Sequence, residues 1–477
     1  MGQDERAEVD TIMERALSAA AVFSQYDQEA TDRLVRAAYE AGFAERVRLA
    51  KLAHEETGIG NWRDKVLKNV FATQYVYEDI RHVRTAGVLS EDDEKGIVEI
   101  AQPLGPIFAF VPVTNPTSTT LFKILLALKT RNPIIIHPHS MAKGCAAEAA
   151  RVCYEAALKA DAPEFCVQMA TGLSREGTQA LMGHRGMALI LATGGSAMVK
   201  AAYCSGTPAI GVGAGNVPVY VEKSADLPFA AEQILLSKTF DNGTVCSSEQ
   251  AVVVEACSAE DLRKELEARG GHFLSPKEIE RVGPAVFDRE KKVMRVEIIG
   301  KSADEIARKG GITVPDGTRL LIAPLERVAD EDVLASEILA PIVAWYVARD
   351  FVHAISLCID LNFHGGIGHT VSIYSNDEAK IREFAFEMNA GRILVNTPSS
   401  QGGIGYLFNT LHPSLTLGCG TWGKNSTTDN VTAKHLINVN RIARRRVNDR
   451  FARFDKALYY DESLGASQIE AVYSKNC

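Results

Sequence analysis

The chain has 477 residues, of which 46% are hydrophobic and 23% are charged, and its formal net charge is −8. A length beyond about 250–300 residues predicts more than one domain, and the acidic balance argues against nucleic-acid binding and against a membrane-surface role. No apolar run reaches the roughly 18 residues of a membrane span, and the polar N-terminus lacks a signal-peptide core. We therefore predict a cytoplasmic protein.

The cysteines predict neither disulfides nor a metal site. There are nine of them, no CxxC pair occurs, and none stands at metal-ligand spacing with a histidine. Reduced thiols are the usual state of such a set. The C-terminal Cys477 is expected to be exposed and without a chemical role.

The first half of the chain predicts helices followed by alternating strands and helices. Apolar residues recur at helical spacing through 7–57, and a further helix is predicted at 63–84. The predicted strands lie at 105–112, 133–136 and 188–192, and the helices between and after them lie at 121–129, 142–159 and 197–204. Residues 114–120 are predicted to form a polar loop. This order predicts a parallel sheet with helices on its faces.

A second α/β unit is predicted to begin after residue 230. Apolar runs predict strands at 251–254 and 342–347, and a further strand follows the glycine-rich segment 364–370. The strand predicted at 217–221 is assigned to the first unit. Residues 402–430 are rich in Gly, Ser, Thr and Asn, which is typical of long functional loops.

Cys246 lies in a stretch that suits a nucleophile. It stands between an Asn-Gly turn and the β-branched run at 251–254, so the start of a buried strand would hold it in place. A thiolate there could attack a carbonyl and form a covalent intermediate. The alternative is a buried free cysteine, since cysteine is among the residue types most often buried.

Two glycine-rich turns have different predicted roles. The turn at 193–196 leads from a strand into a helix, which is the arrangement that binds phosphate. The turn at 211–216 leads into a strand, so we interpret it as close backbone packing near a site.

Six segments together resemble the CoA-acylating branch of the aldehyde dehydrogenase superfamily. They lie at 113–119, 192–195, 211–216, 240–250, 366–370 and 415–423. The likeness extends over about residues 10–450 and is strongest to the aldehyde dehydrogenase half of bifunctional aldehyde–alcohol dehydrogenases. It also extends to stand-alone acylating sulfoacetaldehyde and succinic semialdehyde dehydrogenases.

The resemblance implies an α/β fold with a Rossmann-type cofactor domain, an α/β catalytic domain and a small oligomerisation arm. The implied boundaries are 1–90 and 103–230 for the cofactor domain, 231–430 for the catalytic domain, 91–102 and 431–450 for the arm, and 451–477 for a C-terminal tail. The arm implies a homodimer or a larger homo-oligomer.

The same resemblance implies the site residues. Cys246 would be the nucleophile, Asn115 would form an oxyanion hole with the Cys246 backbone N–H, and His369 would handle the CoA thiol proton or be structural. Glu337 would hold the nicotinamide ribose. The remaining cofactor residues would be His137, Pro138, His139, Ser140, Thr193, Gly194, Gly195, Ser196 and Gly213.

One departure from the wider superfamily concerns Val212. Hydrolytic members have a water-activating glutamate at this point, and a valine cannot act as a general base. A thioester at Cys246 should therefore persist until CoA attacks it. The alternatives are a hydrolytic aldehyde dehydrogenase and a scaffold protein that has lost the chemistry.

The sequence is compatible with several aldehyde substrates and with either nicotinamide cofactor. The resemblance implies acetaldehyde or another short aldehyde, or an anionic one such as sulfoacetaldehyde or succinic semialdehyde. The hydroxyl groups that could hold an anionic tail are those of Thr117, Ser118, Thr119, Ser247 and Ser248. NAD and NADP both remain candidates, because Ser140 is uncharged and Lys143 is close to it in sequence. A separate alcohol dehydrogenase is a further implied partner.

Overall fold

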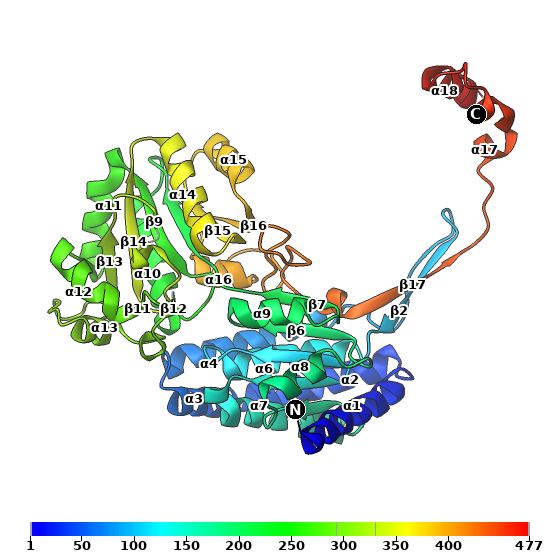
Figure 1. Cartoon of the computed structure of the whole chain (residues 1–477), viewed down its shortest axis with the longest axis horizontal. Coiled ribbons are helices and arrows are strands. Elements are labelled where there is room, and N and C mark those ends of the chain that lie inside the picture. Colours follow the sequence, from blue (N-terminus) through cyan, green and yellow to red (C-terminus); the bar gives the residue numbers. More distant parts are fainter. Residues whose placement is uncertain (1, 292, 330, 476–477) are drawn as a thin grey trace.

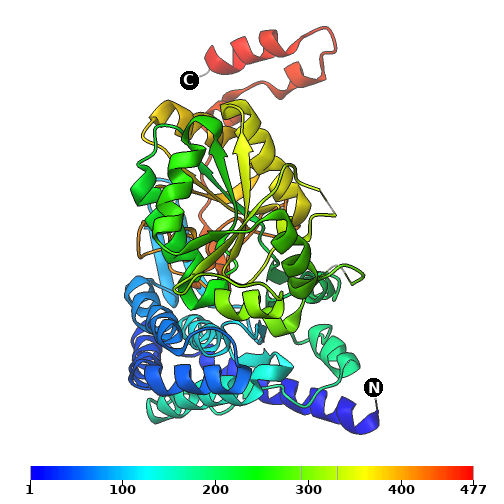
Figure 2. The same cartoon turned by 90° about the vertical axis from the view of Figure 1, so that its left-hand side faces the viewer.

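The structure is a computed structural model that describes residues 2–291, 293–329 and 331–475. It contains a five-stranded parallel sheet, a seven-stranded parallel sheet and a three-stranded antiparallel sheet. The unit around the seven-stranded sheet stacks on the unit around the five-stranded sheet, and the antiparallel strands project from the body as an arm (Figures 1 and 2). The predicted α/β fold is confirmed.

The five-stranded sheet has the order β5-β4-β3-β6-β7. Its strands are β3 (Ile107–Val111), β4 (Ile134–Pro138), β5 (Val167–Met169), β6 (Leu189–Thr193) and β7 (Ala209–Val212). Its helices are α1 (Gln3–Phe23), α2 (Gln28–Ala44), α3 (Arg46–Thr57), α4 (Trp62–Val70), α5 (Val76–Ile80), α6 (Pro116–Lys129), α7 (Lys143–Lys159), α8 (Arg175–Met182) and α9 (Ser196–Tyr203). A π-helical turn, Phe71–Tyr75, joins α4 to α5.

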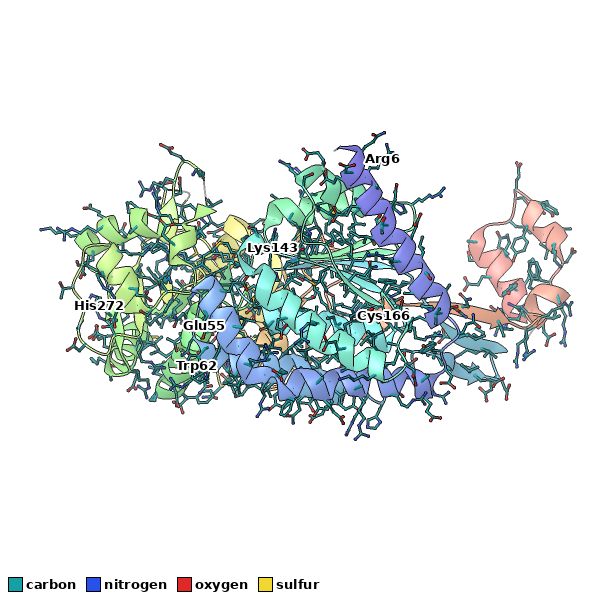
Figure 3. The ribbon with its side chains drawn as sticks, turned by 90° about the horizontal axis from the view of Figure 1, so that it is seen from below. Arg6, Glu55, Trp62, Lys143, Cys166 and His272 are labelled. Atoms are coloured by element: carbon teal, nitrogen blue, oxygen red, sulfur yellow. The ribbon has the colours of Figure 1, made fainter. Side chains whose placement is uncertain are left out.

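Alternating side chains divide this unit into two cores. Ile107 and Ala109 of β3 pack with α2, α6 and α7 on one face, whereas Phe108 and Phe110 pack with α1, α8 and α9 on the other. Both faces of a parallel strand are thus covered, which explains the uninterrupted apolar run of β3. Figure 3 shows the outer helices of this unit from below, with Arg6 on α1, Glu55 on α3 and Lys143 at the start of α7.

The predicted polar loop at 114–120 is wrong for most of its length. Helix α6 begins at Pro116, directly after Asn115, and all of its residues are buried. Proline suits the first helical position, and the Thr120 hydroxyl donates to the Pro116 carbonyl 2.8 Å away, so a polar sequence fits inside a buried helix.

The seven-stranded sheet has the order β10-β13-β14-β9-β8-β15-β16. Its strands are β8 (Val217–Val221), β9 (Glu249–Glu255), β10 (Gly271–Phe273), β13 (Leu320–Pro324), β14 (Ile342–Ala348), β15 (Gly368–Tyr374) and β16 (Ala390–Val395). Helices α10 (Leu227–Thr239) and α11 (Ala256–Ala268) pack on one face, and α14 (Phe351–Gly365) and α15 (Glu378–Glu387) pack on the other. The remaining elements are the hairpin of β11 (Phe287–Asp288) and β12 (Val293–Met294), and helices α12 (Pro276–Val286), α13 (Ala303–Lys309) and α16 (Ser399–Ile404).

The second unit begins earlier than residue 230. Strand β8 pairs in parallel with β9 and β15, so it belongs to the seven-stranded sheet and not to the first unit. The change of sheet falls between β7 and β8, in the glycine-rich segment 213–216. The division of the chain into functional domains stays a prediction.

The arm consists of β1 (Gly87–Asp92), β2 (Ile97–Pro103) and β17 (Ile437–Ala443), in the order β1-β2-β17. The chain then continues to α17 (Asp449–Arg453) and α18 (Ala466–Lys475), which lie at the far end of the arm (Figure 1). The eight cysteines in the described ranges are all free, and Cys477 lies outside them. Within the same ranges, no helix combines the length and the apolar character that crossing a membrane requires.

Candidate active site

A cavity of about 580 Å³ is lined by residues of both parallel-sheet units. Eight of the predicted site residues line it: Asn115, His139, Thr193, Gly194, Gly195, Gly213, Cys246 and Glu337. The other predicted residues, His137, Pro138, Ser140, Ser196 and His369, lie outside this lining. Residues that are far apart in the sequence therefore meet around Cys246.

Cys246 lies just before β9, a strand near the middle of the seven-stranded sheet. Every residue of β9 is buried, so the cysteine is attached to a rigid element, as predicted. Burial, with a smaller contribution from the neighbouring Glu337, raises the pKa of the Cys246 thiol to about 12. The thiol therefore has to lose a proton before it can act as a nucleophile.

Asn115 is held by hydrogen bonds on both sides of its amide. Its Oδ1 accepts from the Lys68 Nζ 2.6 Å away, and its Nδ2 donates to the Thr114 Oγ1 3.1 Å away. One amide hydrogen is left for a group in the cavity. An amide with a free N–H is a candidate oxyanion donor, and this role of Asn115 stays a prediction.

Lys68 belongs to a buried charged cluster with Lys65 and Asp241. The Asp241 carboxylate accepts from both lysines and from the Thr244 hydroxyl, and its other oxygen accepts from the Asn61 backbone N–H. Burial lowers the pKa of Lys68 to about 8, and Asp241 opposes this effect. The sequence analysis did not predict Lys65 or Lys68 as site residues, and it included Asp241 and its partner Thr244 only as members of the 240–250 motif.

The glycine-rich segment between the two sheets packs closely against Cys246, as its sequence indicated. A Cβ on Gly215 would lie 2.8 Å from the Cys246 carbonyl oxygen and 2.9 Å from the His369 ring. The Gly215 backbone N–H donates to the Glu337 Oε1 3.2 Å away. Burial raises the pKa of Glu337 to about 7.

His369 is fully buried behind Gly215. Its Nδ1 lies 2.9 Å from the Thr370 hydroxyl, and its Nε2 has no hydrogen-bond partner among the described residues. Burial, with a smaller effect of Arg392, lowers the pKa of His369 to about 3, so the ring is neutral at working pH. Its role in proton transfer stays a prediction.

Eight of the ten predicted cofactor residues lie at the carboxyl ends of β4 and β6, whereas Gly213 follows β7 and Glu337 precedes β14. His137 and Pro138 end β4, where the His137 Nδ1 lies 2.7 Å from the Ala170 carbonyl oxygen, and His139 and Ser140 follow. Gly195 is the N-cap of α9, and a Cβ on it would meet open space. The carboxyl edge of a parallel sheet is where dinucleotides bind in folds of this type.

Much of the cavity wall is apolar. This part includes Leu67, Val70, Phe71, Tyr75, Val212, Ile404, Leu407, Phe408, Leu415 and Leu417. Val212 is 3% exposed and belongs to a core cluster against which Cys246 packs. Within the described lining, Lys68 is the one lysine or arginine, and its ammonium hydrogens go to Asn115, Asp241 and Thr244.

Residues 1–409 match the model of the aldehyde dehydrogenase family. The chain belongs to this family. As an aldehyde dehydrogenase it is 44% identical, over 95% of its length, to 51% of the bifunctional aldehyde-alcohol dehydrogenase AdhE of Escherichia coli K12. It is 35% identical to the acetylating succinate-semialdehyde dehydrogenase of Clostridium kluyveri, over 91% of this chain and 95% of that one. The crystal structure of an acetylating aldehyde dehydrogenase from Geobacillus thermoglucosidasius matches with a TM-score of 0.91 and 42% identity, over 93% of this chain and 98% of that one.

The resemblance of this aldehyde dehydrogenase to the acylating branch is confirmed. The chain spans about half the length of the curated bifunctional relatives and nearly all of the succinate-semialdehyde enzyme. The roles of individual site residues remain predictions. The family motifs located Cys246 and Asn115, whereas Lys68 lies on an ordinary amphipathic helix, where the sequence offers no signal for it.

Proposed function

We propose that the protein is a CoA-acylating aldehyde dehydrogenase that converts an aldehyde, CoA and NAD(P)⁺ to acyl-CoA and NAD(P)H. The observation that carries this proposal is the pairing of Cys246 and Asn115 in one cavity, with Val212 in its wall. A nucleophile and an oxyanion donor suit acyl transfer, and Val212 offers water no general base at the position where hydrolytic relatives have a glutamate.

The chain's own residues have distinct tasks in this reaction. The Cys246 sulfur attacks the aldehyde carbonyl, and the Asn115 amide with the Cys246 backbone N–H holds the oxyanion. Loss of hydride leaves a thioester on Cys246. The thiol of CoA then displaces Cys246 and carries away the acyl group.

The residues at the sheet edge fit a nicotinamide dinucleotide. The open space around Gly195 and the start of α9 suit a pyrophosphate, and Glu337 faces the cavity where the nicotinamide ribose would lie. When bound, the nicotinamide supplies the hydride acceptor. Ser140 carries no charge and Lys143 lies nearby in sequence, so we propose that NADP is accepted as well as NAD.

The apolar lining favours neutral aldehydes over anionic ones. The Thr117 hydroxyl donates to the Asn69 Oδ1 2.9 Å away, and the Ser247 hydroxyl donates to the Ser400 carbonyl 3.1 Å away. Of the five hydroxyl residues considered for an anionic tail, Thr119 is the one that lines the cavity. A sulfonate or carboxylate tail would therefore lose hydration without a free cation to replace it.

The proposal also covers the oligomeric state, a partner enzyme and the location of the protein. The arm of β1, β2 and β17 supports a homo-oligomer. A separate alcohol dehydrogenase would be the partner that reduces the aldehyde further, and a cytoplasmic location suits soluble substrates of this kind.

The test is NAD(P)H formation from acetaldehyde, butanal, sulfoacetaldehyde and succinic semialdehyde, each with and without CoA and with either cofactor. The proposal expects sustained turnover only with CoA, loss of turnover in Cys246→Ala, and higher kcat/KM for the neutral aldehydes. Sustained turnover without CoA would refute acylation. Higher kcat/KM for the anionic aldehydes would refute the substrate class alone.

A further inference from the structure

The charged cluster of Lys65, Lys68 and Asp241 is buried beside the cavity. Lys65 is 2% exposed, Lys68 is 4% exposed and Asp241 is fully buried, so two cations share one buried anion, and the part-buried Asp64 carboxylate accepts from the Asp241 backbone N–H. Charges in such surroundings are costly to bury and need full hydrogen bonding. Their arrangement therefore has to be explained by stability or by function.

The contacts of Lys68 are complete and point to one neighbour in particular. An ammonium group has three hydrogens and no acceptor, and here they go to Asp241 Oδ2, to the Thr244 hydroxyl 2.8 Å away and to the Asn115 Oδ1 2.6 Å away. Because Lys68 can only donate, the Asn115 amide must present its oxygen to Lys68. Its NH₂ group is then turned away from Lys68.

The cation also changes the strength of the amide as a donor. A positive charge at Oδ1 draws electron density from the amide and makes its N–H hydrogens more positive. Hydrogen bonds in series polarise one another, and the lower dielectric around buried side chains increases the effect. A more positive N–H stabilises a developing oxyanion better.

Asp241 ties this cation to the nucleophile segment. It lies five residues before Cys246, and its backbone has a φ of 46°, in the left-handed region that residues other than glycine seldom adopt. Such a conformation costs about 1–3 kcal/mol and persists where the surroundings fix it. A Cβ on Gly60 would lie 2.0 Å from the Asp241 Oδ1, so the absence of a side chain there is what admits the carboxylate.

We infer that Lys68, anchored by Asp241, is a positioning residue that orients and polarises the Asn115 amide for oxyanion formation. This inference rests on the proposed roles of Cys246 and Asn115. Lys65 provides the matched comparison, because its Nζ contacts the same Asp241 carboxylate but otherwise donates to the Thr114 backbone carbonyl 3.0 Å away.

The decisive variants are Lys68→Met, Lys65→Met, Asn115→Ala and the double variant Lys68→Met/Asn115→Ala. Each single lysine variant leaves the Asp241 carboxylate with the other lysine as its cationic partner, so Asp241 is not left as an unpaired buried charge and the fold should survive. The readout is the rate of the first NAD(P)H burst without CoA, followed in a stopped-flow instrument. Alkylation of Cys246 by iodoacetamide forms no oxyanion, so its rate reports whether the nucleophile segment is intact.

We expect Lys68→Met to slow the burst by about 10–100-fold, because small displacements of a reacting group carry penalties of this size. Lys65→Met should slow it by less than about threefold, and the double variant should match Asn115→Ala, since the lysine acts through the amide. Alkylation should stay within about twofold throughout. If Lys68→Met is insoluble, Lys68→Gln removes the charge while keeping a polar group and should also slow the burst.

Three results would overturn the inference: a burst unchanged in both Lys68 variants, a full additional loss in the double variant, or alkylation slowed as much as the burst. The last would mean that Lys68 only supports the fold of the segment. A burst unchanged by Asn115→Ala would instead refute the oxyanion role of Asn115 in the proposed function.

Discussion

Replacing Val212 with glutamate tests whether the apolar wall is what protects the thioester. Val212 ends β7, lines the cavity and packs in the cluster that contacts Cys246. A carboxylate on this residue would stand beside the acyl group and could remove a proton from water. We expect Val212→Glu to give NAD(P)H formation that continues without CoA.

The size of the effect follows from the pKa of the new carboxyl group. Burial raises the pKa of Glu337, which lines the same cavity, from 4.5 to about 7. A similar shift at position 212 would leave about half of the carboxyl groups ionised at pH 7 and would destabilise the fold by about 3 kcal/mol. A positioned general base gives about 10²–10⁴-fold, so hydrolysis should rise by at least about 50-fold at pH 7.

The assay is steady-state turnover without CoA between pH 6 and 8.5, with Val212→Gln as the matched control. Gln has nearly the same volume and admits water equally well, but it cannot accept a proton at these pH values. Hydrolysis by Val212→Glu should increase with pH up to about 8 and then level off. Equal hydrolysis by the two variants would refute the general-base argument, as would a Val212→Glu enzyme that keeps its burst and its CoA-dependent turnover but shows no hydrolysis.

Two further predictions concern buried or bound carboxylates. Burial raises the pKa of Glu249 from 4.5 to about 7, so the folded protein keeps this proton where the unfolded chain has lost it. The wild type should therefore lose up to about 3 kcal/mol of stability relative to Glu249→Gln as the pH rises from 4.5 to 7. Urea unfolding of both proteins at pH 4.5 and 7.5 would measure this loss. A stability difference between them that does not change with pH would contradict the prediction. The Glu56 carboxylate accepts from the Gly144 and Cys145 backbone N–H groups at the start of α7, shortly after Ser140. Glu56→Gln should raise the ratio of kcat/KM for NADP to kcat/KM for NAD by about fivefold, because it removes a screened repulsion of roughly 1 kcal/mol between this carboxylate and the 2′-phosphate. An unchanged ratio would show that the carboxylate does not face the 2′-phosphate.

The local signals in the sequence predicted the long apolar strands such as β3, β4, β6 and β9, but not β5, β7 or β10. The run that became β3 and the β-branched run within β9 are uniformly apolar, because parallel strands between two layers of helices are buried on both faces. The position of Cys246 followed from the same pattern, since a turn and a buried strand flank it. Asn115 became recognisable only through the family motif around it.

The features that the sequence did not predict depend on contacts between distant residues. Strand β8 follows β7 closely in the chain but pairs with β9 and β15. The sheet that β8 joins is therefore determined by strands that come later in the chain. Lys68 and Asp241 are 173 residues apart, and Lys68 lies on a helix whose pattern resembles an ordinary half-exposed one. The polar residues at the start of α6 predict a loop from sequence alone, because the hydrogen bonds of their hydroxyl groups form only in the folded structure.

Water in the cavity would weaken both the effect of the charged cluster on Asn115 and the protection that the apolar wall gives the proposed thioester. Water that entered the cavity would screen Lys68, weaken the polarised Asn115 amide and attack the thioester. Apolar residues such as Phe71 and Leu417 line the cavity and offer such water no hydrogen-bond partner, and Val212 beside them cannot act as a base. Electrostatic interactions are several-fold stronger in such surroundings than in water. In the proposed reaction, Lys68 behind the oxyanion donor and an apolar wall around Cys246 would together favour formation of the acyl-enzyme and preserve it until a thiol arrives.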